Sequence, residues 1–409
     1  MNRSYRILPC YTGDVSGAAS ALYELGGMVV IHDPSGCNST YNTHDENRWY
    51  DNDSLIFISG LSHREAIFGE DKKFIDDIAE AAEKLNPKFI ALTSSPIPFM
   101  NGTDFNAIAK IVREKTGILT FIVSTNGMHD YIVGAGNALE AAARYLTSDA
   151  SDRKQSVSDH SKNRINILGL TPLDFTKDAA FTVKDRLTEA GFEIVSSWSY
   201  GCTLQDIQRS HIADVNLVVS AAGYQAALVL KEKYGTPYVC GCPTGLFANI
   251  VYDMMKQSAT DKKDRIAYKE SFEAVPNKSD FSKTGTSGQP EKFLLIGEPI
   301  AMSSLASALE MQYGIQTKVA CPLELKKINA SVLLRDGDIL CDGEEEIEAA
   351  LKNEKYVIAD PMYGNILPEG SKLYGLPHLA FSGRGFMWHK ENIPDIYSVI
   401  DNDELHTIL

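Results

Sequence analysis

The sequence predicts an α/β protein with three Rossmann-like parallel-sheet domains around a central cleft. Short apolar, β-branched runs alternate with helical stretches along the 409 residues, which is the pattern of βαβ units. Two polar stretches interrupt this pattern, at residues 147–163 and 256–292. They divide the chain into three expected domains, at 1–150, 160–255 and 290–409, and each is long enough for a small α/β unit.

Each expected domain contains strands separated by helices. The second and third domains begin alike, with an apolar strand, a turn that contains proline and then a helix, and we interpret this as a weak internal repeat. The expected strands lie at 27–32, 55–58, 88–93, 119–124, 164–170, 192–198, 215–220, 236–240, 293–297, 316–320 and 356–360, and the clearest helices at 71–85, 106–115 and 225–234.

Composition and charge exclude several classes of protein. Hydrophobic residues make up 44% of the chain and charged residues 23%, as in ordinary soluble proteins. No apolar run reaches the roughly 18 residues of a membrane span, and no signal-peptide block follows the N-terminus, so we expect a cytoplasmic protein. The net charge of -15 argues against nucleic acid and anionic membrane surfaces as partners.

The seven cysteines are the most informative residues. An odd number without any C-x-x-C pair argues against a disulfide framework and a zinc ribbon. Ligands of parallel sheets bind at the carboxyl ends of the strands. Five cysteines end or follow predicted strands, whereas Cys341, before an acidic helix, is interpreted as structural; the five are Cys37, Cys202, Cys240, Cys242 and Cys321.

Cys37 ends the block Pro34-Ser35-Gly36-Cys37, and Cys10 follows Pro9. A glycine before a thiolate allows the backbone to approach a bulky iron–sulfur cluster. The alternative is a pair of buried free cysteines, which is the commoner fate of a single cysteine. Spacing alone leaves both interpretations open.

Several blocks occur in a fixed order along nearly the whole chain. Together they resemble the nitrogenase component 1 family, which includes the nitrogenase α and β subunits, their cofactor-assembly scaffolds, and the dark-operative protochlorophyllide and nickel-sirohydrochlorin reductases. The blocks are residues 9–10, 26–37, 62–73, 93–96, 102–104, 124–127, 203–207 and 232–238.

The resemblance implies that Cys10 and Cys37 are iron–sulfur ligands at a subunit interface. A third cysteine of the family is replaced here by Ser95. Two cysteines from each of two chains would complete a single [4Fe-4S] cluster, whereas an eight-iron cluster would lack thiolates. Ser95 is either an oxygen ligand of this cluster or a plain helix-capping residue.

The resemblance also implies partners and excludes one substrate. The cysteine that holds the nitrogenase cofactor is replaced by Ser220, and no clear match to the cofactor's histidine lies near residues 381–385, so dinitrogen reduction is disfavoured. The chain has no P-loop; in this family ATP hydrolysis belongs to a separate iron protein. The expected partners are that ATP-hydrolysing, nitrogenase-type iron protein and a second copy or a paralogous subunit.

Other residues are weaker candidates. Cys202, Cys240 and Cys242, with Cys321 nearby, are expected to form a second metal or cluster site in the central cleft, or else an inert pocket lining. The loop with Glu46 and Arg48 contributes either to the interface or to proton supply, or is simply solvated. Arg384 is a candidate for binding an anionic group of a substrate.

Three functions are compatible with this sequence. The first is a reductase in which an interface cluster relays low-potential electrons to a substrate in the central cleft. The second is a non-catalytic scaffold that holds a metal cluster for transfer. The third is a binding protein that has lost its cluster.

Overall fold

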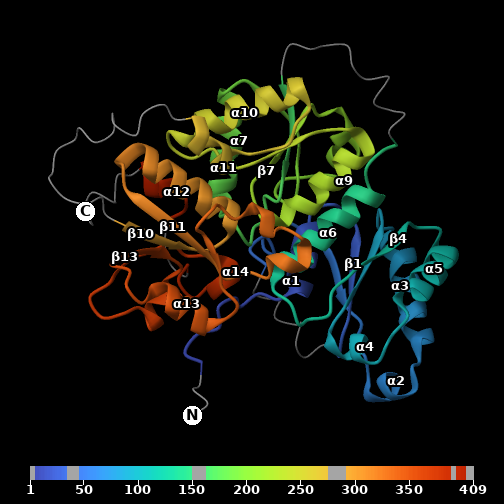
Figure 1. Cartoon of the computed structure of the whole chain (residues 1–409). Helices are drawn as coiled ribbons and strands as arrows, with labels where there is room; N and C mark the ends of the chain where they lie inside the picture. The colour runs from blue at the N-terminus through green and yellow to red at the C-terminus, as the bar shows by residue number, and fades with distance from the viewer. Residues whose placement is uncertain (1–4, 35–45, 150–162, 275–291, 388–392, 402–409) are drawn as a thin grey trace.

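The structure of this chain is a computed structural model that describes residues 5–34, 46–149, 163–274, 292–387 and 393–401. Its described strands form three separate sheets, and neighbouring strands in each sheet are parallel. All eleven expected strands are present, which confirms the α/β class with three parallel sheets. Figure 1 shows three lobes, each built on one sheet. None of the described helices has the length and apolar character needed to cross a membrane.

The first lobe contains a four-stranded sheet in the order β2-β1-β3-β4. β1 and β3 are buried along their whole length, which explains their continuous apolar sequences. Helices α3 and α5 cover one face of the sheet, and α1 and α6 cover the other. The elements are β1 (Met28–His32), β2 (Leu55–Ile58), β3 (Ile90–Ser94), β4 (Thr120–Val123), α1 (Asp14–Leu22), α2 (His63–Phe68), α3 (Asp71–Leu85), α4 (Pro96–Met100), α5 (Phe105–Thr116) and α6 (Tyr131–Tyr145).

The second lobe contains a five-stranded sheet in the order β6-β5-β7-β8-β9. Its central strands are buried, and its helices lie on both faces, as in other doubly wound sheets. The elements are β5 (Asn163–Leu168), β6 (Phe192–Ser197), β7 (Val215–Val218), β8 (Tyr238–Cys240), β9 (Arg265–Ile266), α7 (Lys177–Glu189), α8 (Leu204–Arg209), α9 (Tyr224–Tyr234), α10 (Phe247–Asp261) and α11 (Ala267–Ala274), with the short 3₁₀ helices η3 (Ser210–Ile212) and η4 (Ala221–Gly223).

The third lobe contains five strands in the order β12-β11-β10-β13-β14. As in the second lobe, the opening strand pairs with the next strand on one side and with a later strand on the other. The third sheet differs by the short edge strand β12, which pairs with β11. The elements are β10 (Lys292–Ile296), β11 (Gln316–Cys321), β12 (Ile339–Leu340), β13 (Tyr356–Ala359), β14 (Lys372–Gly375), α12 (Pro299–Tyr313), α13 (Glu344–Leu351), α14 (Leu379–Ser382) and α15 (Ser398–Asp401), with the 3₁₀ helices η6 (Leu325–Ile328), η7 (Ser331–Leu333) and η8 (Pro361–Ile366).

The polar stretch at 256–292 is not a linker along its whole length. α10 continues to Asp261, β9 adds a strand to the second sheet, and α11 follows. Two apolar residues within this polar stretch explain the difference, because Ala267 and Tyr268 are completely buried. The Tyr268 hydroxyl also donates a hydrogen bond to the Leu333 carbonyl oxygen at 2.8 Å, which ties α11 to the third lobe. The domain boundaries themselves stay predictions.

Helix α6 lies at the centre of the molecule, where all three lobes meet (Figure 1). The segment Gly134-Ala135-Gly136 lies within this helix, and all three of its residues are buried. A Cβ atom at Gly134 would lie 1.7 Å from the Asp14 carbonyl oxygen, and one at Gly17 of α1 would lie 2.2 Å from the Tyr131 carbonyl oxygen. The two helices thus cross so closely that only glycine fits at these contacts.

We expect Gly134→Ala to destabilise the protein by about 1–3 kcal/mol or more, because the added methyl group forces the backbones of α1 and α6 apart. Gly136→Ala is the matched control on the same helix, since its Cβ would meet only the Ile328 methyl group, at 3.3 Å, and the Ala222 carbonyl oxygen, at 3.8 Å. Urea unfolding of both variants measures the difference. Equal stability of the two variants would contradict the close crossing.

Candidate functional site

Cys10 lies in an extended segment that crosses from the third lobe to the first. Its Sγ donates hydrogen bonds to the carbonyl oxygens of Ala380, at 3.5 Å, and Thr12, at 3.6 Å. The segment is fixed on both sides, because the Tyr11 amide donates to the Ala380 carbonyl oxygen at 3.0 Å and the Tyr363 hydroxyl to that of Pro9 at 3.0 Å. Burial, and next the charge of Asp130, raise the pKa of the Cys10 thiol, so it keeps its proton unless a metal replaces it.

Cys37 lies outside the described residues, but the chain that leads to it is visible. β1 ends at His32, and the chain continues to Pro34 beside the loop that carries Ser95. The Ser95 amide donates a hydrogen bond to the His32 carbonyl oxygen at 3.2 Å. The chain that leads to Cys37 therefore starts next to Ser95, the residue that we expect to replace the family's third cysteine.

Ser95 occupies the N-cap position of α4, but its side chain makes no capping hydrogen bond. The residue is completely buried, and its Oγ has no hydrogen-bond partner among the described residues. The interpretation of Ser95 as a plain helix-capping residue is therefore wrong, because its hydroxyl caps no backbone amide of α4. A buried hydroxyl without a partner costs free energy, which is compatible with a group that binds there.

Contacts of Asp14 connect the Cys10 segment with the Ser95 loop. The buried Asp14 carboxylate accepts hydrogen bonds from the amides of Asn126, at 2.9 Å, and Gly127, at 2.8 Å. Gly127 is in the left-handed region, with φ of 70°, and packs against Pro96, whose Cδ would lie 2.5 Å from an added Cβ. The two candidate ligand positions thus belong to one connected part of the first lobe.

Large apolar side chains are exposed around both positions. Leu8 is 60% exposed and Tyr11 is 50% exposed, on either side of Cys10. Exposed apolar groups that lie close together are typical of protein interfaces. Further members of this set are Tyr5 before Cys10, Ile97, Phe99 and Met100 in α4 after Ser95, and Met128 next to Gly127.

A second polar cluster lies at the junction of the three lobes, and Asp174 is its centre. The fully buried Asp174 carboxylate accepts hydrogen bonds from the Tyr131 hydroxyl of the first lobe, from Thr171 at 2.7 Å and from Ser220 at 2.8 Å. His378 of the third lobe places its Nε2 3.6 Å from Asp174 Oδ1. This arrangement brings groups that can hold protons together from all three lobes.

Glu298 is the other buried acid of this junction. It follows β10, and its carboxylate accepts hydrogen bonds at 2.7 Å from the amides of Ala221 and Ala301. Burial, and next the charge of Asp174, raise the pKa of Glu298, and burial likewise raises the pKa of Tyr131 well above its usual range. Sequence reasoning missed both acids, because they are far apart in sequence and only the folded chain brings them together.

The remaining cysteines do not converge on one site in this structure. Cys240 and Cys242 lie near Glu298, and the Cys242 Sγ donates to the Val219 carbonyl oxygen at 3.1 Å. Cys202 instead lies beside Asp206 and Glu24. In the part of the chain that is described, no group of three or more His, Cys, Asp or Glu side chains is placed to hold a metal ion. A second metal site at these cysteines stays a prediction and would require their side chains to rearrange.

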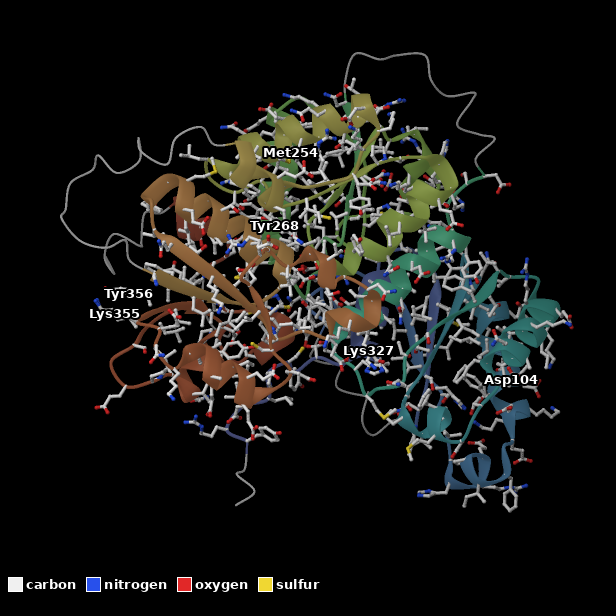
Figure 2. All side chains as sticks on the ribbon, in the orientation of Figure 1. Asp104, Met254, Tyr268, Lys327, Lys355 and Tyr356 are labelled. Atoms are coloured by element: carbon white, nitrogen blue, oxygen red, sulfur yellow. The ribbon has the colours of Figure 1, made fainter. Side chains whose placement is uncertain are left out.

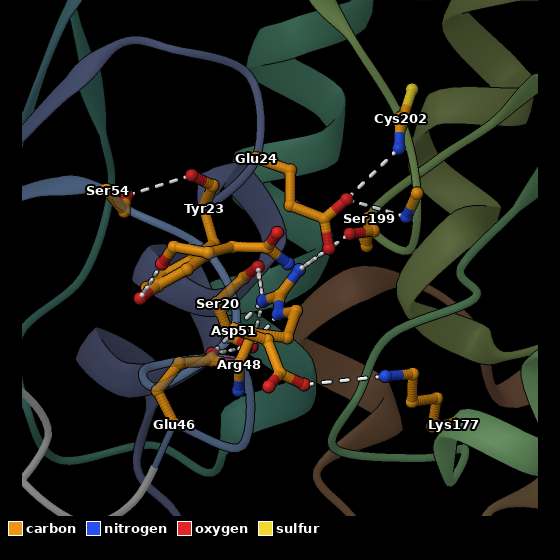
Figure 3. A network of polar contacts seen from close by, with 12 residues as sticks. Ser20, Tyr23, Glu24, Glu46, Arg48, Asp51, Ser54, Lys177, Ser199 and Cys202 are labelled. Carbon is orange, nitrogen blue, oxygen red and sulfur yellow. Dashed lines mark hydrogen bonds and ion pairs between the residues drawn. The ribbon is translucent and has the colours of Figure 1, made fainter.

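Glu46 and Arg48, where the described chain resumes after Cys37, are buried rather than solvated, since both are only 2% exposed. Figure 3 shows the Arg48 guanidinium between the first and second lobes. It donates to Glu46 at 2.7 Å, to Glu24 at 2.8 Å and to the Ser199 carbonyl oxygen at 2.7 Å. The solvated-loop interpretation was wrong for these two residues, because two carboxylates and the carbonyl oxygens of Ser199 and Ser20 compensate the buried charge of Arg48.

Comparison with known proteins decides the family. A family model described as "Nitrogenase component 1 type Oxidoreductase" matches residues 14–366. The chain belongs to this family. Among solved structures, a chain of "Nitrogenase Cp1 at pH 6.5" superimposes with a TM-score of 0.66 and 17% identity, covering 100% of this chain and 94% of that chain. At this identity the likeness confirms the fold.

Curated relatives of this nitrogenase component 1 type protein have different roles. NifE of Clostridium pasteurianum, a nitrogenase iron-molybdenum cofactor biosynthesis protein, is 27% identical over 247 residues, which are 56% of this chain and 52% of NifE. The B subunit of light-independent protochlorophyllide reductase of Nostoc punctiforme is 24% identical over 182 residues, 44% of this chain and 36% of that subunit. The match to NifE thus spans about half the length of each protein.

We expect Arg48→Met to destabilise the protein by about 3–5 kcal/mol at neutral pH, because it leaves Glu46 and Glu24 buried without a countercharge. Arg48 lowers the pKa of the Glu46 carboxyl in the folded protein. In the parent, the ion pair therefore stabilises the fold fully at pH values above the pKa that Glu46 has in the unfolded chain. This stabilisation is lost as the pH falls through the lower pKa that Glu46 has in the folded protein. The difference in free energy of unfolding between the parent and Arg48→Met should therefore become smaller as the pH falls.

Lys177→Met is the matched control for Arg48→Met. Its ion pair with Asp51 also joins the first and second lobes, at 3.4 Å, but both side chains are 60% exposed (Figure 3). An exposed pair contributes about 0–1 kcal/mol. Urea unfolding between pH 4 and 8 measures both variants. If Arg48→Met loses no more free energy of unfolding than Lys177→Met, Arg48 is not the essential countercharge of Glu46 and Glu24.

Proposed function

We propose that this protein is the reductase component of a nitrogenase-like system, which receives low-potential electrons through an interface [4Fe-4S] cluster and reduces a substrate at the three-lobe junction. The observation that carries this proposal is the Asp174 cluster, in which Tyr131, Ser220 and His378 converge from all three lobes on one buried carboxylate. Reduction of an organic or metal-bound substrate consumes protons as well as electrons, and this cluster can hold protons away from water.

Cys10 and Cys37 of each of two chains would hold the cluster, and the family and the residues support this. Cys10 has a fixed backbone, Ser95 has an unpartnered buried hydroxyl, and exposed apolar side chains surround both. When bound, a four-iron cluster supplies one-electron transfer at low potential. The exposed apolar side chains around these positions fit a subunit interface. An interface is also required because each chain supplies only two of the four thiolates that the cluster needs. The electron donor would be an ATP-hydrolysing, nitrogenase-type iron protein.

The residues at the junction define what this chain can do to a substrate. The Tyr131 hydroxyl holds its proton toward Asp174, and the raised pKa of Glu298 favours its protonated form near neutral pH. Ser220 donates its hydroxyl to Asp174 where nitrogenase has a cofactor cysteine, so no thiolate is available there. The proposed substrate would therefore be bound by protein groups that donate hydrogen bonds while it is reduced. Reduction of dinitrogen on the nitrogenase cofactor is not the proposed reaction.

A second function is favoured by a specific observation, namely that several curated relatives are NifE proteins of cofactor biosynthesis. A scaffold would hold a metal cluster and release it to an acceptor, with no catalytic turnover. The two functions differ in their electron count. A reductase consumes electrons for as long as substrate and ATP are present, whereas a scaffold takes up only the few that its bound cluster accepts.

The discriminating experiment combines the anaerobically purified protein with an iron protein, ATP and a candidate substrate. Sustained ATP-dependent electron consumption with product formation supports the reductase. Electron uptake that stops after one cluster equivalent, together with transfer of iron to an apo acceptor protein, supports the scaffold and overturns the reductase. A colourless protein without iron or sulfide overturns both.

We expect the parent protein to contain four irons and four sulfides per two chains, and Cys10→Ser and Cys37→Ala to lose them, because a cubane needs four thiolates. Cys341→Ser is the matched control, since Cys341 is a buried cysteine of the third lobe without a proposed ligand role. Iron and sulfide analysis with EPR spectroscopy measures each variant. Eight irons per two chains in the parent, or unchanged iron in Cys37→Ala, would disprove the ligand assignment.

A further inference from the structure

A cavity of about 470 Å³ lies at the carboxyl ends of β3 and β4, next to the Ser95 loop, and it shares no lining residue with the Asp174 cluster. Most of its lining comes from the first lobe, but Lys327 reaches it from η6 of the third lobe. Figure 2 shows Lys327 where these two lobes meet. The carboxyl ends of parallel strands are the usual place for ligands in α/β sheets, and this volume is that of a small-molecule site.

The described lining of this cavity contains one lysine, Lys327, and no carboxylate. The acidic side chains of Glu324 and Asp130 are not among the lining residues, and they contact each other's backbone amides and His129 instead. Glu324 Oε2 lies 3.1 Å from His129 Nδ1 and accepts from the Asp130 amide at 3.3 Å. Asp130 in turn accepts from the Glu324 amide at 2.7 Å. Lys327, by contrast, makes no ion pair within the described part of the chain. Its ammonium group is thus the charge at the cavity that a ligand can neutralise.

The rest of the lining combines apolar surface with neutral polar groups. Phe99 and Phe105 contribute aromatic surface, and Ser124 and Asn137 contribute polar groups. Asn137 Nδ2 donates to the Ser124 carbonyl oxygen at 2.7 Å, which fixes the orientation of the amide. An apolar wall with a few oriented polar groups and one cation is a pattern that binds an organic anion.

We propose that this cavity binds a small organic carboxylate with an apolar or aromatic body, whose carboxylate pairs with Lys327 and whose body packs against Phe99 and Phe105. Because the lining comes from two lobes, the bound ligand also holds the first and third lobes together. The cavity lining includes neither proposed cysteine ligand and no residue of the Asp174 cluster, so binding here is measured separately from iron content and from reduction.

The test uses benzoate as the probe and benzamide, its uncharged analogue, as the control ligand. Ligand-observed NMR titration of the full chain gives both affinities. We expect benzoate to bind with saturation and benzamide to bind at least about tenfold more weakly, since only the carboxylate can pair with Lys327. Benzoate should also raise the midpoint of thermal unfolding, because it binds the folded state only.

Two neighbouring lysines provide matched variants. Lys326 and Lys327 are both exposed residues of η6, but only Lys327 lines the cavity. Lys327→Gln should weaken benzoate at least about tenfold and leave the stability without ligand unchanged, whereas Lys326→Gln should bind as the parent does. No saturable benzoate binding up to 10 mM, equal binding of benzoate and benzamide, or equal losses in the two variants would each overturn the proposal.

Discussion

The close packing of helix α6 is the constraint on which the rest of the structure depends. Gly134 allows α1 to approach on one side, and Gly136 faces Ile328 of the third lobe and Ala222 of the second. Eleven of the fifteen residues of α6 are buried, and alanine and glycine predominate among them. Small residues lower the distance between packed backbones, so three sheets can share one central helix. The Cys10 segment and the Asp174 junction both lie against this helix.

Charge is buried where the lobes meet, and in each case it is compensated locally. Arg48 is surrounded by two carboxylates and two backbone carbonyl oxygens, and Asp174 by three hydroxyl donors and His378. Such groups contribute little net free energy when all are paired, but any alternative packing would leave a charge unpaired. They therefore specify how the lobes are placed. Ser199, whose carbonyl oxygen Arg48 binds, has a φ of 86°, a strained conformation that this contact helps to hold.

The strands could be predicted from the sequence, because their pattern is local. The three-lobe junction could not, because its contacts join residues that are far apart in sequence. Buried parallel strands are continuous apolar runs, so residues such as Val29 and Leu217 were readily assigned. α11 was missed because a few buried residues in a polar stretch carry its packing. Glu46 and Arg48 looked solvated because charge is usually exposed, and their partners Glu24 and Ser199 are far away in sequence. Asp174 and Glu298 were overlooked because only the folded chain brings them together. The cysteine ligands stay predictions, since Cys37 is outside the described residues.

The contacts of the N-terminal segment determine when Cys10 acquires its surroundings. Tyr11 binds Ala380, Pro9 accepts from Tyr363, and the amide of Ile7 donates to Glu344 at 2.9 Å. The segment is synthesised before these partners, which lie much later in the sequence, at residues 344, 363 and 380. Contacts of such long sequence separation form late in folding. The native environment of Cys10 therefore forms only after residues up to 380 have been translated and folded, so any iron at the proposed Cys10 site would be inserted after that stage.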